Sequence, residues 1–459
     1  MDALSKTTFQ KPNIQTYKMY LILQLLVIIS AFISLEHGPI TVYAKPYTSA
    51  VASVNKHTDG AKPLYSVQML TTYINTMEYL PGNFLIDIDA PIIWHDCIVQ
   101  ENMYHGSCPP NTLCTSPVSC EESECSEVRT FYSYKNPSCP PEIDGHSSSR
   151  WGSCTCGVNV LNPVTGSCDQ PLLNYDEFTL RTSDGRNVFS NGNYGTFPKA
   201  ACAPSSSVAS FPANVSGVMA FSSSLYAFPA SSYPPLKRTF ALCFPSKTSA
   251  PGVLFLGAGP YYLLPQSNVD VRSYLSYTPL LTRPDSFDTH PDSFGYFIRV
   301  NSILIKKRSI NVPANTTTKL STMDPYTTLR TDIYNSVVRR FSMVTKRLRP
   351  AKPVAPFGLC FSTSTNGLRV PDIDFNLPDG KKWTVSTANS IKQITSEVAC
   401  LAFVDGGATS EPAIVIGTFQ FEDNFLVFDL VNSTFGFSSS LLHKKTSCSN
   451  FNFTLTYNA

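Results

Sequence analysis

Two carboxylates lie close together in an apolar segment near residue 87. The segment reads NFLIDIDAPIIW from Asn83 to Trp94, and Asp87 and Asp89 are two positions apart. Side chains alternate across a β-strand, so a strand here would place both carboxyl groups on one face. Two carboxyl groups that share a proton can act as base and acid toward a water molecule. Asp87 and Asp89 are therefore the first candidates for chemistry.

Other catalytic and cofactor patterns are not found. The chain has seven His residues, and none lies in a context typical of a Ser-His-Asp or Cys-His pair. No phosphate-binding or dinucleotide-binding loop occurs. Cys154-Thr-Cys156 lacks a second matching pair, which favours disulfide bonds over zinc. We expect no metal and no cofactor.

The N-terminus indicates secretion. Three Lys residues precede an apolar run over 19–35, and Val42-Tyr43-Ala44 is typical of a signal-peptidase site. A membrane anchor is the alternative, but the run is short and interrupted by polar residues. We expect a signal peptide over 1–44, no membrane association after its removal, and an extracellular or cell-wall location (the apoplast).

Composition supports the same compartment. Fourteen Cys residues suggest up to seven disulfides, and nine of them lie in an irregular excursion over 97–168. A net charge of +2 without a long basic run excludes nucleic acid as a partner. Four Asn-x-Ser/Thr sequons are candidates for glycosylation. They begin at Asn214, Asn315, Asn432 and Asn452.

The apolar periodicity predicts mostly short strands. Residues 83–94 carry apolar side chains on both faces of a strand, and residues 296–305 alternate. Residues 412–437 read as three short strands. One clear helix is predicted over 332–348, where apolar residues recur at spacings of three and four. With 459 residues, the chain is expected to form two lobes.

The chain resembles the pepsin-like aspartic proteases. LIDIDAPIIWHDC at 85–97 resembles their first active-site strand, and residues 414–437 resemble the segment that closes their second lobe. The match is highly specific to a secreted plant subgroup of xylanase inhibitors, extracellular dermal glycoproteins, xyloglucan-endoglucanase inhibitors and legume basic globulins. It rests on YTPLL at 277–281, KLSTMDPYTTL at 319–329, APFGLCFSTS at 355–364 and CSNFNFT at 448–454.

This resemblance implies a fold and a degenerate site. The expected fold is all-β and bilobal, with a few short helices, an N-terminal lobe over 45–268 and a C-terminal lobe over 269–459. Asp87 corresponds to the first catalytic Asp, but Ser321 stands at the second. A hydroxyl cannot supply the second carboxylate, so we expect no proteolysis.

The subgroup implies a protein partner. Its members inhibit cell-wall-degrading glycoside hydrolases through basic side chains on two loops, and a monomer is expected here. Arg369 falls in the first of these loops, and His443, Lys444 and Lys445 fall in the second. Ordinary surface charge is the alternative interpretation of these four residues. An aspartic endopeptidase that uses Asp87, or a storage or peptide-binding globulin, remains the alternative function.

Overall fold

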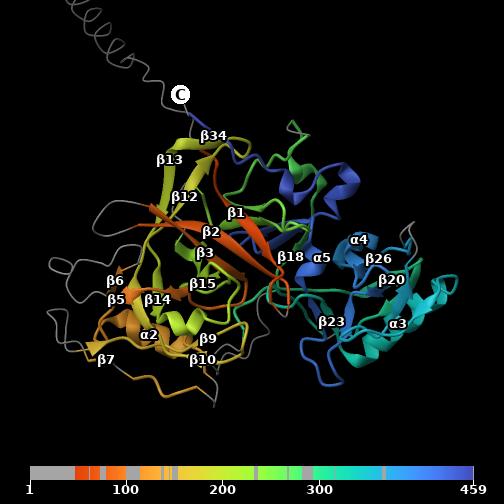
Figure 1. Ribbon diagram of the computed structural model, residues 1–459, viewed down its shortest axis with the longest axis horizontal. Coiled ribbons are helices and arrows are strands. Elements are labelled where there is room, and N and C mark those ends of the chain that lie inside the picture. The colour runs from red at the N-terminus through yellow and green to blue at the C-terminus, as the bar shows by residue number, and fades with distance from the viewer. Residues whose placement is uncertain are drawn as a thin grey trace, which may run out of the picture. The chain divides into compact units, whose positions relative to one another are not determined.

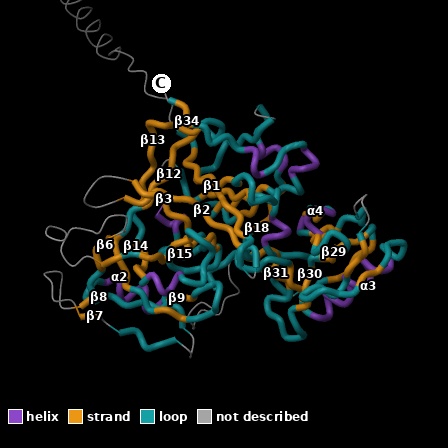
Figure 2. The backbone as a smooth tube through the Cα atoms, in the orientation of Figure 1, coloured by secondary structure: helices purple, strands orange, loops and turns teal. Residues whose placement is uncertain are grey.

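The computed structural model describes residues 47–60, 62–72, 79–99, 114–135, 139–143, 145–146, 154–231, 236–265, 268–281, 293–314, 316–363 and 368–457. The predicted signal peptide and the sequon at Asn315 lie outside these residues. The described chain is mostly strand and loop, with short helices between them (Figure 2). The all-β class is therefore confirmed.

The largest sheet joins strands from both ends of the chain. Within the described ranges it contains 17 strands, and the late strands β32, β33 and β34 pair with β16, β18 and β13 respectively. Figure 1 shows β34 beside β13. Its strands are β1 (Ser49–His57), β2 (Leu64–Thr72), β3 (Tyr79–Asp87), β4 (Trp94–Asp96), β5 (Ile98–Val99), β6 (Cys114–Pro117), β11 (Leu172–Tyr175), β12 (Phe178–Ser183), β13 (Val188–Thr196), β14 (Lys199–Ala203), β15 (Val215–Ala220), β16 (Thr239–Cys243), β17 (Gly252–Leu256), β18 (Ser276–Pro279), β32 (Phe425–Asp429), β33 (Thr434–Phe437) and β34 (Leu455–Thr456).

Residues 297–416 form three smaller sheets of their own. The first contains β19 (Phe297–Ile298), β22 (Thr318–Leu320), β31 (Ile414–Ile416), β23 (Thr327–Leu329) and β30 (Phe403–Asp405). The second contains β21 (Arg308–Asn311), β20 (Ser302–Ile305), β26 (Ile373–Asn376) and β27 (Lys382–Val385). The third contains β24 (Pro350–Ala351), β25 (Cys360–Ser362), β29 (Val398–Leu401) and β28 (Ile391–Gln393). The predicted division at residues 268 and 269 stays a prediction.

The excursion after Cys97 contains regular structure as well as loops. It holds two small ladders and one helix. These elements are β7 (Gly145–His146) with β8 (Cys154–Thr155), β9 (Val160–Leu161) with β10 (Cys168–Asp169), and α2 (Ser123–Phe131). The other α-helices within the described ranges are α3 (Thr331–Val344), α4 (Thr387–Ser390) and α5 (Thr418–Phe421).

One strand pattern occurs twice. β15 runs parallel to β3 and antiparallel to β4, while β31 runs parallel to β22 and antiparallel to β23. The tight connections from β3 to β4 and from β22 to β23 therefore occupy equivalent places in the two halves. Asp87 is the last residue of β3, and Ser321 directly follows β22.

The burial of β3 explains its sequence. Phe84 and Ile86 pack into one apolar cluster, and Leu85 between them packs into another. Both faces are thus covered, as the continuous apolar run predicts. The strand ends earlier than expected, at Asp87, and the chain bends before β4 begins at Trp94. The prediction of one continuous strand over 83–94 is therefore wrong, because β3 and β4 are separate strands.

The helix and the three late strands agree with their patterns. The predicted helix over 332–348 is α3, which ends four residues earlier than expected, at Val344. The hydroxyl of Thr345 donates to the carbonyl of Phe341 at 2.7 Å, which competes with helix continuation. β31, β32 and β33 confirm the three strands expected over 412–437.

Six disulfides join described Cys residues. Cys243 pairs with Cys448, so the end of the chain is tied to the N-terminal half. Cys154 and Cys156 pair with Cys120 and Cys125, which assigns the C-x-C motif to disulfides. The remaining bonds are Cys97–Cys202, Cys139–Cys168 and Cys360–Cys400. These bonds indicate folding in an oxidising compartment.

A buried ion pair also connects the chain ends. Lys56 in β1 donates to Glu422 at 2.7 Å, and both side chains are only 6% exposed. The hydroxyl of Tyr65 in β2 donates to the same carboxylate oxygen at 2.7 Å. Burial raises the pKa of Glu422, while Lys56 and Tyr65 oppose that rise. Each group neutralises the charge of the other in these buried surroundings, and the ammonium group of Lys56 also donates to the carbonyl of Ser246 at 2.9 Å.

We predict that Glu422→Leu destabilises the protein by about 3–5 kcal/mol, because the ammonium group of Lys56 stays buried without its partner. The double variant Lys56→Met/Glu422→Leu should be less destabilised, since it buries no charge. Denaturant unfolding with the disulfides intact measures both free energies. A double variant at least as unstable as the single one would contradict the prediction.

Candidate functional site

The Asp87 carboxyl group is buried and stabilises a turn. Its side chain is 8% exposed, and Oδ1 accepts from the backbone N–H groups of Asp89 at 2.8 Å and Ala90 at 3.2 Å. Burial raises the pKa of Asp87 to about 6, and the charge of Asp89 adds to the rise. The two N–H bonds and the ammonium group of Lys319 limit it. Asp87 is therefore an acid whose charge changes near pH 6.

Ser321 builds the matching turn in the other half of the chain. It is 6% exposed, and its Oγ accepts from the backbone N–H groups of Met323 at 3.3 Å and Asp324 at 3.0 Å. These are residues two and three positions further on, as for Asp87. The hydroxyl thus replaces the carboxylate as a hydrogen-bond acceptor in the turn, but it carries no charge and is no acid near neutral pH.

The two turns are joined by one hydrogen bond. The backbone N–H of Ile88 donates to the Oγ1 of Thr322 at 3.2 Å, and both residues are buried. Ile88 has no hydroxyl group, so the reciprocal bond from residue 322 to a residue 88 side chain cannot form. The connection is therefore asymmetric.

Asp89 does not pair with Asp87 as a second acid. The strand ends before it, and its carboxylate forms an ion pair with Lys319 of β22. Its Oδ1 also accepts from the hydroxyl of Ser293 at 2.6 Å. The expectation that Asp87 and Asp89 share one strand face is wrong, because the bend after β3 turns Asp89 toward residues of the other half.

A cavity of about 280 Å³ opens beside Asp87. Asp87 and Asp89 line it with Ala90, Pro91 and Ile92. Its remaining lining comes from β4, the segment after α2, β9 and the residues before β19, and is largely aromatic or apolar. These residues are Trp94, Tyr132, Tyr134, Lys135, Val160, Leu161, Ser293 and Phe294. Ser321 is not among them.

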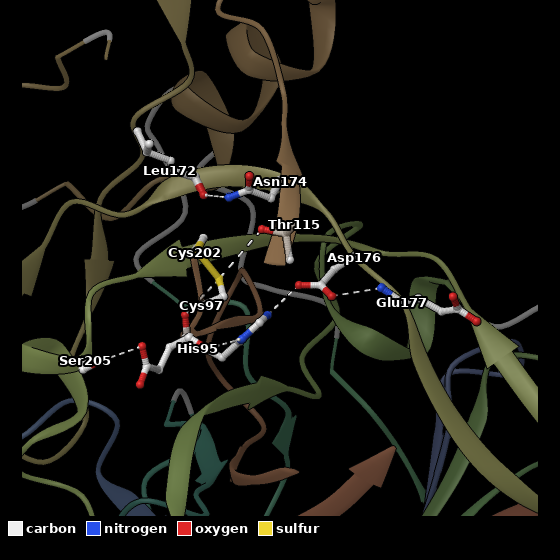
Figure 3. The surroundings of a disulfide bond; sticks show 10 residues. His95, Cys97, Thr115, Leu172, Asn174, Asp176, Glu177, Cys202 and Ser205 are labelled. Atoms are coloured by element: carbon white, nitrogen blue, oxygen red, sulfur yellow. Dashed lines mark hydrogen bonds and ion pairs between the residues drawn. A yellow bond between two sulfur atoms is a disulfide. The ribbon is translucent and has the colours of Figure 1, made fainter. Parts of the chain in front are cut away.

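A second buried acid–base pair lies in the N-terminal half. His95 is fully buried, and its Nε2 lies 2.5 Å from the Oδ2 of Asp176 (Figure 3). Figure 3 shows the imidazole directed toward this carboxylate beside the Cys97–Cys202 disulfide. Burial alone would lower the pKa of His95. Asp176 and the Asp96 carbonyl together raise this pKa by more than burial lowers it, so it lies above its usual value. Its contacts are structural, since the rings of Phe84 and Phe178 flank it.

The basic residues of the second predicted loop form an exposed turn. His443 and Lys444 end a short 3-10 helix, η5 (Leu441–Lys444), and Lys445 follows in a left-handed conformation with φ of 57°. All three are exposed. We call residues 443–445 the basic turn. The ammonium group of Lys444 lies 5.1 Å from the ring centre of Tyr274, which holds this one side chain against the protein.

Arg369 lies on a different segment. It is exposed just before β26, and its neighbours Leu368 and Val370 pack against the core. Its guanidinium group forms no hydrogen bond or ion pair with any other residue in the described ranges. The structure thus presents Arg369 to solvent and does not join it to the basic turn.

Three of the four sequons fall on described residues, and their Asn side chains are exposed: Asn214, Asn432 and Asn452. Glycosylation of any of them stays a prediction. Among the described helices none is long and apolar enough to cross a membrane. The described part of the chain also holds no cluster of His, Cys, Asp or Glu residues that could bind a metal ion.

Several partners of the site residues could not be predicted from the local sequence pattern. Lys319, Ser293 and the aromatic walls of the cavity come from segments far from Asp87 in the sequence. The sequence did contain one signal for the ion pair between Lys319 and Asp89. Lys319 lies two residues before Ser321, and Asp89 lies two residues after Asp87, so both are close to the equivalent turns. His95 was visible as a lone imidazole in the apolar run IIWHDC, which indicates a buried histidine that needs a partner.

Two equivalent strand–turn units that meet at a buried carboxyl group define a pepsin-like fold with only half of its usual pair of acids. Comparison with known proteins agrees. Residues 76–258 match the family described as xylanase inhibitor N-terminal, and residues 295–439 match xylanase inhibitor C-terminal. The chain belongs to this xylanase-inhibitor family.

Similar proteins cover most of the chain. The "Probable aspartic proteinase GIP2" of Nicotiana benthamiana is 32% identical over 86% of this chain and 90% of its own length. "Gamma conglutin 1" of Prunus dulcis is 36% identical over 81% of this chain and 83% of its own. The solved structure titled "Crystal structure of edgp" has a TM-score of 0.73 and 30% identity, and covers 89% of this chain and 100% of that one. The bilobal pepsin-like fold and the subgroup are therefore confirmed.

We predict that Asp87→Asn stabilises the protein at neutral pH. Between about pH 4 and pH 6 the unfolded chain loses the Asp87 proton while the folded chain keeps it, so wild-type stability falls as pH rises through this window. The pKa rise from 3.8 to about 6 corresponds to a loss on the order of 2–3 kcal/mol. Asn keeps the acceptor oxygen of the turn and carries no charge.

Urea unfolding at several pH values measures this effect. The variant should exceed the wild type in unfolding free energy at pH 7 and match it below pH 4. Asp379→Asn, which removes an exposed carboxyl group from the short 3-10 segment Pro378–Gly380, is the control. Parallel stability curves for wild type and Asp87→Asn would contradict the prediction.

Proposed function

We propose that this protein is secreted to the extracellular space or cell wall, where it acts as a monomeric inhibitor of cell-wall-degrading glycoside hydrolases. Xylanase and xyloglucan endoglucanase are the target classes, and defence of a plant wall is the setting. The basic turn carries the proposal, because it presents cations on a fixed support. The family membership and the oxidising compartment support it.

Buried residues on both sides of the basic turn anchor it to the core. Leu441 and Cys448, on either side of it, are fully buried in one apolar cluster. Cys448 is bonded to Cys243 of β16, and its backbone N–H donates to the buried Asp423 at 2.9 Å. The N–H of Lys445 donates to the carbonyl of Leu442 at 3.1 Å and closes the turn. A preorganised turn loses little conformational entropy when it enters a partner.

The chemistry of the target explains the charge. Glycoside hydrolases hold two carboxyl groups about 5–10 Å apart in their clefts. A cation placed between them gains charge-assisted hydrogen bonds in a site that excludes water. His443 or Lys445 can supply this cation, and the exposed Arg369 can supply a second contact from its own loop. Lys at 445 gives a point charge and not the two-pronged contact of Arg.

Peptide cleavage is not part of the proposal. It requires a second acid facing Asp87, and Ser321 occupies the equivalent turn with a hydroxyl group. Asp89, the nearest other carboxylate in sequence, is paired with Lys319. General acid–base help typically contributes about 10²–10⁴-fold to a rate, so the missing group is a large loss.

We predict that the purified protein inhibits one or more fungal xylanases or xyloglucan endoglucanases at stoichiometric amounts. Lys445→Asn should weaken inhibition by about tenfold or more, as expected for the loss of a buried hydrogen bond to a charged group. Asn tolerates the left-handed conformation at this position, so the substitution leaves the turn unstrained. Residual hydrolase activity against inhibitor concentration gives the inhibition constant.

Arg347→Ala is the matched control. Arg347 is exposed beyond α3, outside both loops, and its loss should leave inhibition unchanged. Failure to inhibit any of the tested xylanases and xyloglucan endoglucanases would refute the proposal. Cleavage of a denatured protein at pH 3–5 that Asp87→Asn abolishes would favour an endopeptidase instead. Recovery of a peptide ligand without any hydrolase would favour a storage or peptide-binding globulin.

A further inference from the structure

The cavity beside Asp87 contains one polar atom without a partner at its floor. Oδ1 of Asp87 is occupied by two backbone N–H groups, whereas no group in the described ranges donates to Oδ2. The side chain is 8% exposed, and Asp87 lines the cavity. Asp87 lines the cavity, so Oδ2 can accept a hydrogen bond from a molecule that enters it.

The charged groups around the cavity do not cancel the negative charge of ionised Asp87. Asp89 is neutralised by Lys319 of β22. Lys135, the other cation on the lining, donates to the carbonyl of Thr130 at 3.1 Å, at the C-terminal end of α2. The remaining titratable groups on the described lining are the phenols of Tyr132 and Tyr134, which carry no positive charge in either protonation state. Lys319 attracts the Asp87 carboxylate through space, but no cation in the described ranges forms a direct ion pair with it.

The aromatic part of the lining is held in place by packing and hydrogen bonds. The ring of Tyr132 packs between those of Tyr226 and Phe294, with centroid distances of 5.0 and 5.4 Å. The carbonyl of Phe294 accepts from both the backbone N–H and the hydroxyl of Ser223. On the other side Trp94 is fully buried against Phe211. Such walls favour a flat ring or another apolar body.

The size of the cavity limits the ligand. A water molecule occupies about 30 Å³ in the liquid, so about 280 Å³ corresponds to roughly nine non-hydrogen atoms. A phenyl ring with a two-carbon chain and an amino group has this size.

We propose that this cavity is a binding site for a small primary ammonium group with an aromatic body, which donates to the Oδ2 of Asp87. The aromatic body lies against the packed rings of Tyr132 and Phe294 and against Trp94, which line the same cavity. The group can belong to a free arylalkylamine or to the amino terminus of a peptide that begins with an aromatic residue. This site is separate from the basic turn, so it does not depend on the proposed inhibition of hydrolases.

Calorimetric titration with phenethylamine tests the site on the purified protein. The ammonium ion binds the ionised carboxylate, and the ionised fraction of free Asp87 rises from about 0.1 at pH 5 to about 0.9 at pH 7. Binding should therefore tighten about tenfold between these pH values. At pH 5 it should release close to one proton per site. Phenylalanyl-glycyl-glycinamide, in a parallel titration, distinguishes a peptide amino terminus from a free amine.

Three controls separate the role of the carboxylate from that of the cavity. Asp87→Asn keeps the turn acceptor and should abolish the tightening with pH, and 2-phenylethanol should bind the wild type without pH dependence. Leu161→Trp narrows the cavity at a residue that is 37% exposed and should weaken binding about tenfold or more without changing the thermal midpoint. No binding at about 10 mM phenethylamine, or equal binding by Asp87→Asn, would overturn the proposal.

Discussion

The hydrogen bond from Ile88 to Thr322 joins two turns that are built alike, and the structure of the site depends on this contact. Each turn begins with a side-chain oxygen that accepts two backbone N–H groups, from Asp87 in one half and from Ser321 in the other. In a catalytic pair these oxygens would also exchange protons. The structural role of these oxygens can be separated from their role in proton exchange, because a hydroxyl oxygen can also accept hydrogen bonds. The fold therefore keeps its central turns although one acid is absent.

Loss of the second acid changes the electrostatics around the first. Two acids at this position would share a proton and one negative charge. Here Asp89 and Lys319 form a cross-connection between the halves, with Ser293 as a further donor to Asp89. Asp87 remains as a single buried acid with its pKa raised to about 6. The chain thus replaces a reactive pair with a structural ion pair and one isolated carboxyl group.

Local patterns predicted most of the elements, and long-range partners escaped prediction. The two-sided apolar run of β3, the periodicity of α3 and the three late strands follow from residues adjacent in sequence, which is what periodicity reports. The partner of Asp89 could not be predicted in this way. Lys319 lies 230 residues away, and its approach depends on how two separate turns meet. The same holds for His95 and Asp176, which lie on neighbouring segments of the fold but 81 residues apart in sequence.

The basic turn and the Asp87 cavity rest on different parts of the core. Leu441 and Cys448 belong to an apolar cluster built on β16, β17 and β32, whereas Trp94 and Tyr226, beside the cavity, belong to another. Substitutions at distant sites without shared partners usually have nearly additive effects on stability. The two regions can therefore diverge separately. A chain of this fold can lose an acid beside one cavity while it retains cations on a turn that another cluster supports.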